Sequence, residues 1–178
     1  GSVWEEDMDL LIPLINSNSD YQIIIAPHDI KSKHLQTWGN QIQTKTLFYS
    51  QWDQTEKSPI LIIDNIGMLS RLYQYATIAY VGGAFGEGLH NILEPIGFGV
   101  PVIFGKVRKV NKFPEAEEAI AQGCGFSVRD GEELNEKFDA LKNPLFMQNA
   151  RQAAKNWVES QLGASAKILA YTSKYLKS

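Results

Sequence analysis

Glycine and polar side chains of possible chemical use come together in one stretch, residues 82–95, as Gly-Gly, Gly-x-Gly and His-Asn-x-x-Glu-Pro. Glycine tolerates positive φ and lets backbone N–H groups approach a ligand without a Cβ in the way. We expect a helix to begin near Asn91, because Pro95 lacks an N–H and is tolerated in a first turn. The free N–H groups there, with His90, Asn91 and Glu94, would favour an anion such as phosphate. The stretch therefore predicts an anion site.

A second interpretation remains open, in which the glycines only allow a tight βα turn and Glu94 is solvated. The convergence of three short motifs within one turn of one helix favours the ligand-binding interpretation. Apolar, β-branched runs at 77–81 and 101–104 flank the stretch and predict buried parallel strands. A polar cluster beyond the carboxyl end of such a strand is where open α/β sheets bind ligands.

Six short apolar runs alternate with segments of helical periodicity along the chain. The runs cover residues 21–26, 46–49, 60–63, 77–81, 101–104 and 125–128. This alternation predicts an α/β fold, a Rossmann-like doubly wound parallel sheet of about six strands, in one domain spanning residues 1–178. We expect Ser2 to cap the first helix, and further helices to run to Asn40, over 69–75 and over 114–123, 131–141, 145–160 and 163–176.

Composition excludes several classes of protein. The formal net charge of -3 gives no basic field, which argues against a nucleic-acid partner. The single cysteine, Cys124, allows neither an internal disulfide nor a cysteine metal cluster, and we expect it to be structural. No apolar run approaches the roughly 18 residues of a membrane span and no signal peptide is visible, so we expect the chain as given to be soluble.

The central stretch resembles the donor-binding motif of the 3-deoxy-D-manno-octulosonic acid (Kdo) transferases, which move Kdo from CMP-Kdo to lipid A precursors in lipopolysaccharide synthesis. The match runs through Val-Gly-Gly at 81–83 and Gly-Leu-His-Asn-Ile-Leu-Glu-Pro at 88–95. Ala84 stands where the family has serine. The opening Gly-Ser-x-x-Glu-Glu also resembles a family segment that follows a strand, so Gly1-Ser2 is either native or an expression scar.

A second match covers Asp64, Gly67 and Leu69, which resemble the family segment Asp-Thr-Met-Gly-Glu-Leu. Met68 replaces its glutamate. In related glycosyltransferases this turn presents backbone groups to the nucleotide base, which here implies a role for residues 66–68. A helix cap in which Ile66 and Met68 simply pack is an equally weighted alternative.

Two further features fit the resemblance in part. His28 follows the strand at 21–26, where the family has a histidine near the donor, although the Pro-Glu-Arg that follows it in the family is absent here. Lys106, Arg108, Lys109 and Lys112 form a cationic loop that would screen the phosphate and sugar carboxylate of CMP-Kdo. A solvated basic loop without a ligand is the alternative.

The resemblance implies the C-terminal, donor-binding domain of a GT-B glycosyltransferase, without metal or cofactor. The residues it assigns to substrate binding are Gly83, Gly86, Glu87, Gly88, His90, Asn91, Glu94, Ile66, Gly67, Met68, His28 and Lys106. It places the general base in an N-terminal domain absent from this sequence. That domain would meet the lipid A precursor at the cytoplasmic face of the bacterial inner membrane, so we expect this chain alone to bind nucleotide weakly and catalyse nothing. The alternatives are a GT-B domain that uses a UDP-sugar, as transferase or epimerase, and a non-catalytic α/β module.

Overall fold

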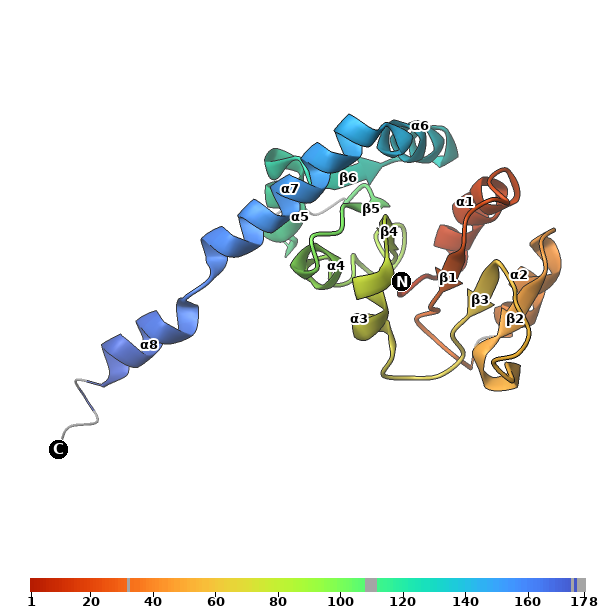
Figure 1. The fold of residues 1–178 in the computed structure, drawn as a ribbon, viewed down its shortest axis with the longest axis horizontal. Coiled ribbons are helices and arrows are strands. Elements are labelled where there is room, and N and C mark those ends of the chain that lie inside the picture. Colours follow the sequence, from red (N-terminus) through yellow and green to blue (C-terminus); the bar gives the residue numbers. More distant parts are fainter. Residues whose placement is uncertain (32, 108–111, 174, 176–178) are drawn as a thin grey trace.

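The structure is a computed structural model, and it describes residues 1–31, 33–107, 112–173 and 175. Two parallel three-stranded sheets form its framework (Figure 1). The first has the order β1-β3-β2 and contains β1 (Ile23–Ile25), β2 (Thr46–Phe48) and β3 (Ile60–Ile62). The second has the order β4-β5-β6 and contains β4 (Ala79–Val81), β5 (Val102–Gly105) and β6 (Gly125–Val128). These strands confirm the α/β class and the six predicted runs.

The prediction of a single six-stranded sheet is wrong, and the segment Gly1–Val3 shows why. This segment lies between the carboxyl ends of β1 and β4. The Val3 N–H donates to Ala26 O at 3.2 Å, and the Gly82 N–H donates to Gly1 O at 3.0 Å. Val3 also forms an isolated parallel bridge with Pro27. Within the described ranges this segment provides the backbone hydrogen bonds that join the two sheets, and it is too short to continue a ladder along β1 and β4.

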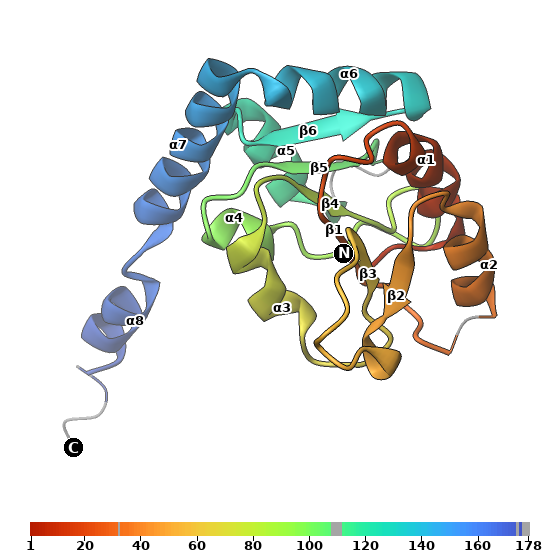
Figure 2. The same ribbon diagram turned by 45° about the vertical axis from the view of Figure 1, so that its right-hand side comes forward.

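Helices cover both sheets. Their bounds are α1 (Glu5–Asn16), α2 (His34–Gln41), α3 (Leu69–Leu72), α4 (Leu93–Gly97), α5 (Pro114–Gln122), α6 (Gly131–Lys142), α7 (Pro144–Gln161) and α8 (Ala164–Thr172), with 3-10 turns at Tyr49–Gln51 and Tyr73–Tyr75. Alternating residues of β5 enter different core clusters: Ile103 packs with α1 and α6, and Phe104 packs with α4, α5 and α7. A third cluster joins α1 and α2 to the first sheet. Figure 2 shows α1 between α6 and α2, which it contacts on its two sides.

Two helix starts differ from the prediction. Trp4 occupies the N-cap of α1 in place of Ser2, whose φ is +53°, and the Trp4 N–H donates to the Asp7 carboxylate at 2.9 Å. The helix begins late because Gly1–Val3 is engaged with β1 and β4. The helix expected near Asn91 begins at Leu93 and is only five residues long.

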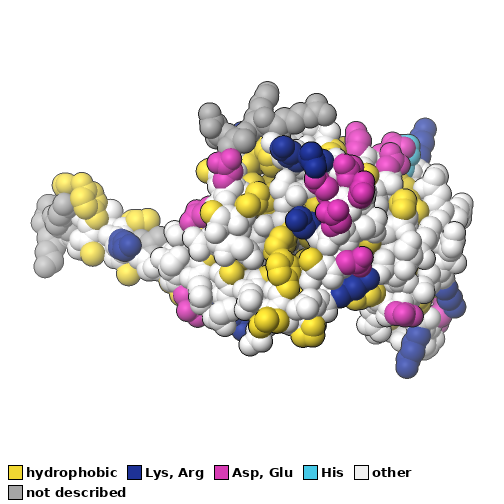
Figure 3. Space-filling view, turned by 90° about the horizontal axis from the view of Figure 1, so that it is seen from above, with side chains coloured by type: hydrophobic (Ala, Val, Ile, Leu, Met, Phe, Trp, Pro, Cys, Tyr) yellow, Lys and Arg dark blue, Asp and Glu magenta, His cyan; other side chains and the backbone are white. Residues whose placement is uncertain are grey.

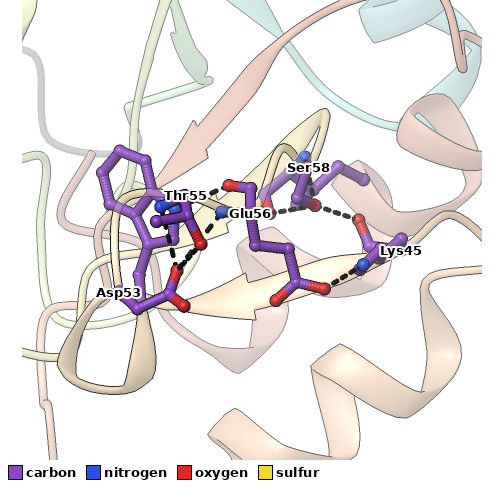
Figure 4. Close-up of polar contacts among 7 residues, drawn as sticks. Lys45, Asp53, Thr55, Glu56 and Ser58 are labelled. Carbon is purple, nitrogen blue, oxygen red and sulfur yellow. Dashed lines mark hydrogen bonds and ion pairs between the residues drawn. The ribbon is translucent and has the colours of Figure 1, made fainter.

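The polar loop between β2 and β3 is held by its own side chains (Figure 4). The Asp53 Oδ1 accepts the N–H of Thr55 at 2.9 Å, its hydroxyl at 2.8 Å and the N–H of Glu56 at 3.2 Å. These hydrogen bonds lower the pKa of Asp53. Ser58 and Glu56 both bond to Lys45, so the loop is fastened back to the start of β2.

Helix α8 projects from the body of the molecule (Figures 1 and 3). Its exposed side chains include Ile168, Leu169 and Tyr171, and Figure 3 shows hydrophobic side chains over this projection. Among the described residues, none of the helices has the length and apolar character needed to cross a bilayer.

Candidate functional site

The glycine turn after β4 is closed by its own backbone. Gly83 has φ +97°, and its carbonyl accepts the N–H groups of Gly86 at 3.1 Å and Gly88 at 2.9 Å. A Cβ on Gly83 would lie 2.3 Å from the Gly88 carbonyl, so no other residue fits without moving the backbone. The ring of Phe85 packs on Gly105 at the end of β5 and holds the turn against the second sheet. Since these N–H groups already donate within the protein, anion contacts here would come mainly from side chains.

The carboxylate of Asp7 lies buried beneath this turn. Its Oδ2 accepts the N–H groups of Gly83 and Trp4, each at 2.9 Å, and its Oδ1 accepts the Tyr80 hydroxyl at 2.8 Å. Only 1% of Asp7 is exposed. Burial and the nearby Asp7 charge both raise the pKa of the Tyr80 phenol. Asp7 thus ties α1 to β4 and the glycine turn, a role that its sequence position, as one of several acids in a first helical turn, did not single out.

Three aromatic side chains from distant parts of the chain meet beside the turn. Trp4 Nε1 donates to His90 Nε2 at 2.9 Å, and the two ring planes are only 9° apart. His28 stacks on both, with ring centroids 4.3 Å from Trp4 and 4.4 Å from His90. Burial, followed by His28, lowers the pKa of His90. The structure therefore brings together the two histidines that the sequence analysis assigned to substrate binding, and it adds Trp4, which that assignment did not include.

Asn91 and Glu94 flank the start of α4. The Asn91 Oδ1 accepts the Leu93 N–H at 3.0 Å, and its amide donates to Glu94 Oε1 at 3.2 Å. The Glu94 charge adds to burial, the larger cause, in raising the pKa of Tyr73. Because Tyr73 lies on the 3-10 turn that extends α3, Glu94 is close to the segment that carries the second predicted motif.

The turn of residues 66–68 is open. Ile66 is 84% exposed, and Gly67 has φ +93° with nothing within 4 Å of the position of a Cβ. Ile66 therefore does not pack into a helix cap, whereas Met68 is half-buried and is the N-cap of α3. Asp64 anchors the preceding residues by accepting the Ser50 N–H at 2.8 Å and hydroxyl at 2.5 Å. The turn leads directly into α3, whose continuation contacts α4, so both predicted motifs lie on one side of the molecule.

Both signs of charge border the glycine turn. The Lys112 Nζ lies 3.7 Å, and the Phe113 ring 3.0 Å, from where a Cβ on Gly88 would be. The Glu6 Oε1 lies 3.6 Å from the equivalent point on Gly86. Lys106 is exposed just after β5, with its N–H donating to Val128 O at 2.7 Å. Arg108 and Lys109, which the basic loop also contains, lie outside the described residues.

No group of His, Cys, Asp or Glu within the described ranges is arranged to hold a metal ion. A cavity of about 260 Å³ adjoins the aromatic cluster. Its lining residues are Val3, Trp4, Glu5, Glu6, Asp29, His34 and Trp38. Glu5 and His34 contact each other across it, with Oε1 and Nδ1 3.1 Å apart.

Comparison with known proteins gives relatives of one main kind. A 3-deoxy-D-manno-octulosonic acid transferase of Aquifex aeolicus is 30% identical over 79% of this chain and 40% of its own length. One from Chlamydophila psittaci is 30% identical over 70% of this chain and 30% of its own length. The chain is a relative of the Kdo transferases. No family model matches it.

This Kdo transferase relative also resembles part of a bifunctional glycosyltransferase/methyltransferase of Fusobacterium nucleatum, 29% identical over 80% of the chain and 23% of that protein. The chain thus spans less than half the length of the curated relatives named here. A solved structure described as the C-terminal CMP-Kdo binding domain of WaaA from Acinetobacter baumannii has a TM-score of 0.73, with 22% identity over 87% of this chain and 84% of that one. This likeness shows that the two chains share one α/β fold.

Proposed function

We propose that residues 1–178 form one nucleotide-sugar-binding domain that binds CMP-Kdo for a Kdo transferase. The observation that carries the proposal is the glycine turn and its His90, Asn91 and Glu94, placed beyond the carboxyl ends of parallel strands in a chain related to these enzymes. The solved structure with the same fold is described as a CMP-Kdo binding domain, which supports this choice of donor.

In this proposal the phosphate lies near Gly88, where the Lys112 ammonium approaches the turn. Lys112, the imidazole of His90 and the amide of Asn91 would supply donors to its oxygens. Negative charge grows on the phosphate as the sugar C–O bond breaks, and donors fixed in advance lower the barrier most. The proposed phosphate surroundings also include Lys106, after β5, and three residues of the glycine turn, Gly83, Gly86 and Glu87.

The nucleoside would extend towards α3. Glu94 is a half-buried acceptor already oriented by Asn91, which suits the hydroxyls of a ribose. At Gly67 the backbone is open, and the exposed Ile66 offers an apolar surface beside it. Such a turn can present backbone groups to the edge of a cytosine and Ile66 and Met68 to its face. His28 completes the site on the side of the aromatic cluster.

We extend the proposal to the whole enzyme only through its relatives. In it a second domain holds the general base and a lipid A precursor, and the reaction takes place at the cytoplasmic face of the bacterial inner membrane. This division of labour predicts that the chain described here binds nucleotide and transfers no sugar. Transfer of Kdo to a lipid A precursor by the 178-residue chain alone would contradict it.

The test is a titration of the chain with CMP, and with UMP and UDP as competitors, followed by amide chemical shifts. We expect CMP-selective changes clustered at residues 83–94 and 66–68. Lys112→Ala should weaken CMP binding several-fold at low salt and by less at high salt, whereas Lys137→Ala, at a half-buried position of α6, should not. Selective binding of UDP at the same residues would retain the fold and replace the donor. Unchanged affinity for all three nucleotides in Glu94→Ala and Asn91→Ala would favour a non-catalytic module.

A further inference from the structure

The hydrogen bond between Trp4 and His90 determines which nitrogen of the imidazole carries a proton. An indole N–H can only donate, so the His90 Nε2 that lies 2.9 Å from Trp4 Nε1 must accept and must be unprotonated. The same edge of the ring faces Gly83, since Cδ2 and Nε2 lie 2.7 Å and 3.0 Å from the position of a Cβ on that glycine. The neutral ring therefore carries its proton on Nδ1, at the opposite edge.

The surroundings hold this arrangement in place. Planes 9° apart and a direct N–H···N bond make Trp4 and His90 a flat, edge-to-edge pair, and His28 stacks across one face of both rings. Rotation of the imidazole would break the hydrogen bond and the stacking together. Gly83, which has no side chain, leaves room for the ring at this position.

We propose that Trp4 is a positioning residue that holds His90 as the Nδ1–H tautomer, so that the ring presents a donor to an anionic group of the nucleotide. The identity of the anion rests on the proposed function, whereas the tautomer does not. Without Trp4, either nitrogen would be free to carry the proton, and half of the neutral rings or more would offer a lone pair where the anion needs an N–H.

The charged groups around His90 act in both directions. His28 lies on its stacked face and the Gly1 amino group is also near, and both lower its pKa, as does burial; Asp7, beneath the turn, raises it. The hydrogen bond from Trp4 also lowers the pKa of His90, because a proton on Nε2 would place two N–H donors against each other. Neutral His90 with its proton on Nδ1 is therefore the form that these contacts favour.

Nitrogen NMR of the chain without ligand tests the tautomer directly. We expect the Nδ1 of His90 to show the shift of a protonated nitrogen and Nε2 that of an unprotonated one at neutral pH. We also expect a scalar coupling across the hydrogen bond between Trp4 Nε1 and His90 Nε2. A protonated Nε2, or the absence of this coupling, would overturn the inference even where no variant folds.

Trp4→Phe removes the donor and retains an aromatic ring. It should mix the His90 tautomers, raise the His90 pKa and weaken CMP binding about two- to tenfold, the equivalent of one ordinary hydrogen bond. Trp52→Phe is the matched control, because Trp52 is also half-buried and its indole donates at 2.7 Å to Glu56 O, away from the site. Unchanged tautomers in Trp4→Phe would refute the inference.

Two substitutions of His90 separate the two nitrogens. Asparagine places an amide donor near the position of Nδ1, and glutamine places one near that of Nε2. We expect His90→Asn to bind CMP more tightly than His90→Gln, and the reverse order would contradict the proposed donor role of Nδ1. If CMP does not bind while the Nδ1–H tautomer is observed, the proposed function fails and the Trp4–His90 pairing stands.

Discussion

Replacement of Asp7 tests whether one buried carboxylate organises the site. Its two oxygens accept three hydrogen bonds, from Trp4 N–H, Gly83 N–H and the Tyr80 hydroxyl, at 2.8–2.9 Å. Asp7→Ala would leave two backbone N–H groups and one hydroxyl without their acceptor in a site where the carboxylate itself is 1% exposed. Asp7→Asn has the same shape. Its carbonyl can take both N–H groups, and its NH₂ can donate to Tyr80, whose hydroxyl can rotate to accept.

These geometries give different expected costs. Each buried donor left unsatisfied costs about 1–3 kcal/mol, and removal of one member of a buried charged network costs about 3–5 kcal/mol, so we expect about 3–5 kcal/mol for Asp7→Ala. Asp7→Asn converts charge-assisted bonds to neutral ones, a loss of about 1 kcal/mol each, and avoids the burial of a charge, which offsets part of that loss. We therefore expect about 0–2 kcal/mol for the amide variant.

Urea unfolding of the 178-residue chain measures both values. Asp9→Ala is the matched control, because Asp9 lies on α1 and is exposed, and we expect a change within about 0.5 kcal/mol. Hydrogen exchange should show faster exchange of the Gly83 amide in Asp7→Ala than in Asp7→Asn. An Asp7→Ala chain as stable as Asp9→Ala, with the Gly83 amide still protected, would refute the assignment of Asp7 as the organiser of the turn.

Three further predictions concern other residues. In urea unfolding, Gly83→Ala should lower the free energy of unfolding by about 2–5 kcal/mol and Gly67→Ala by about 1–2 kcal/mol. Both glycines have positive φ, but of these two only Gly83 has a backbone atom in the way of an added Cβ. Because the pKa of His90 is lowered in the folded chain, the unfolded chain binds more protons below about pH 6.5, the ordinary histidine value. The melting temperature should therefore fall as the pH drops below that value. His90→Phe should reduce this dependence of the melting temperature on pH. Burial raises the pKa of Cys124 to about 11, so the native chain should resist iodoacetamide at pH 8 and react once unfolded; equal rates in both states would contradict this.

Much of the fold could be predicted from local pattern alone. Short apolar runs, three of them followed by glycine or proline, predicted all six strands to within two residues. Gly123 ends α5 in the left-handed conformation typical of a helix C-terminus. The joining of strands into sheets could not be predicted in the same way. It depends on hydrogen bonds between Gly1–Val3 and the ends of β1 and β4. The hydrophobic pattern of the sequence does not indicate contacts between such distant segments.

The candidate site, like the fold, could be predicted from the sequence only in part. Residues with distinctive types and spacing, such as His90, Asn91 and Glu94, could be proposed for the site from the sequence, and their role in binding stays a prediction. Asp7 and Trp4 were not recognised as site residues, because an acid in a first helical turn and an aromatic residue before a helix are common features of soluble domains. Their roles follow from tertiary contacts to residues more than seventy positions away.

The contacts of Asp7 bear on how tightly an anion can bind. A buried carboxylate that fixes the Gly83 N–H holds the turn in one conformation before any ligand arrives, so binding costs less ordering. The same carboxylate adds negative charge near the proposed phosphate, as does Glu6 beside Gly86, and Lys112 is the described cation that the structure places at the turn. The rigidity of the turn therefore favours anion binding, whereas the nearby carboxylates disfavour it. For the proposed nucleotide we therefore expect modest, salt-sensitive affinity, which cations from a neighbouring domain would raise without any change in the turn.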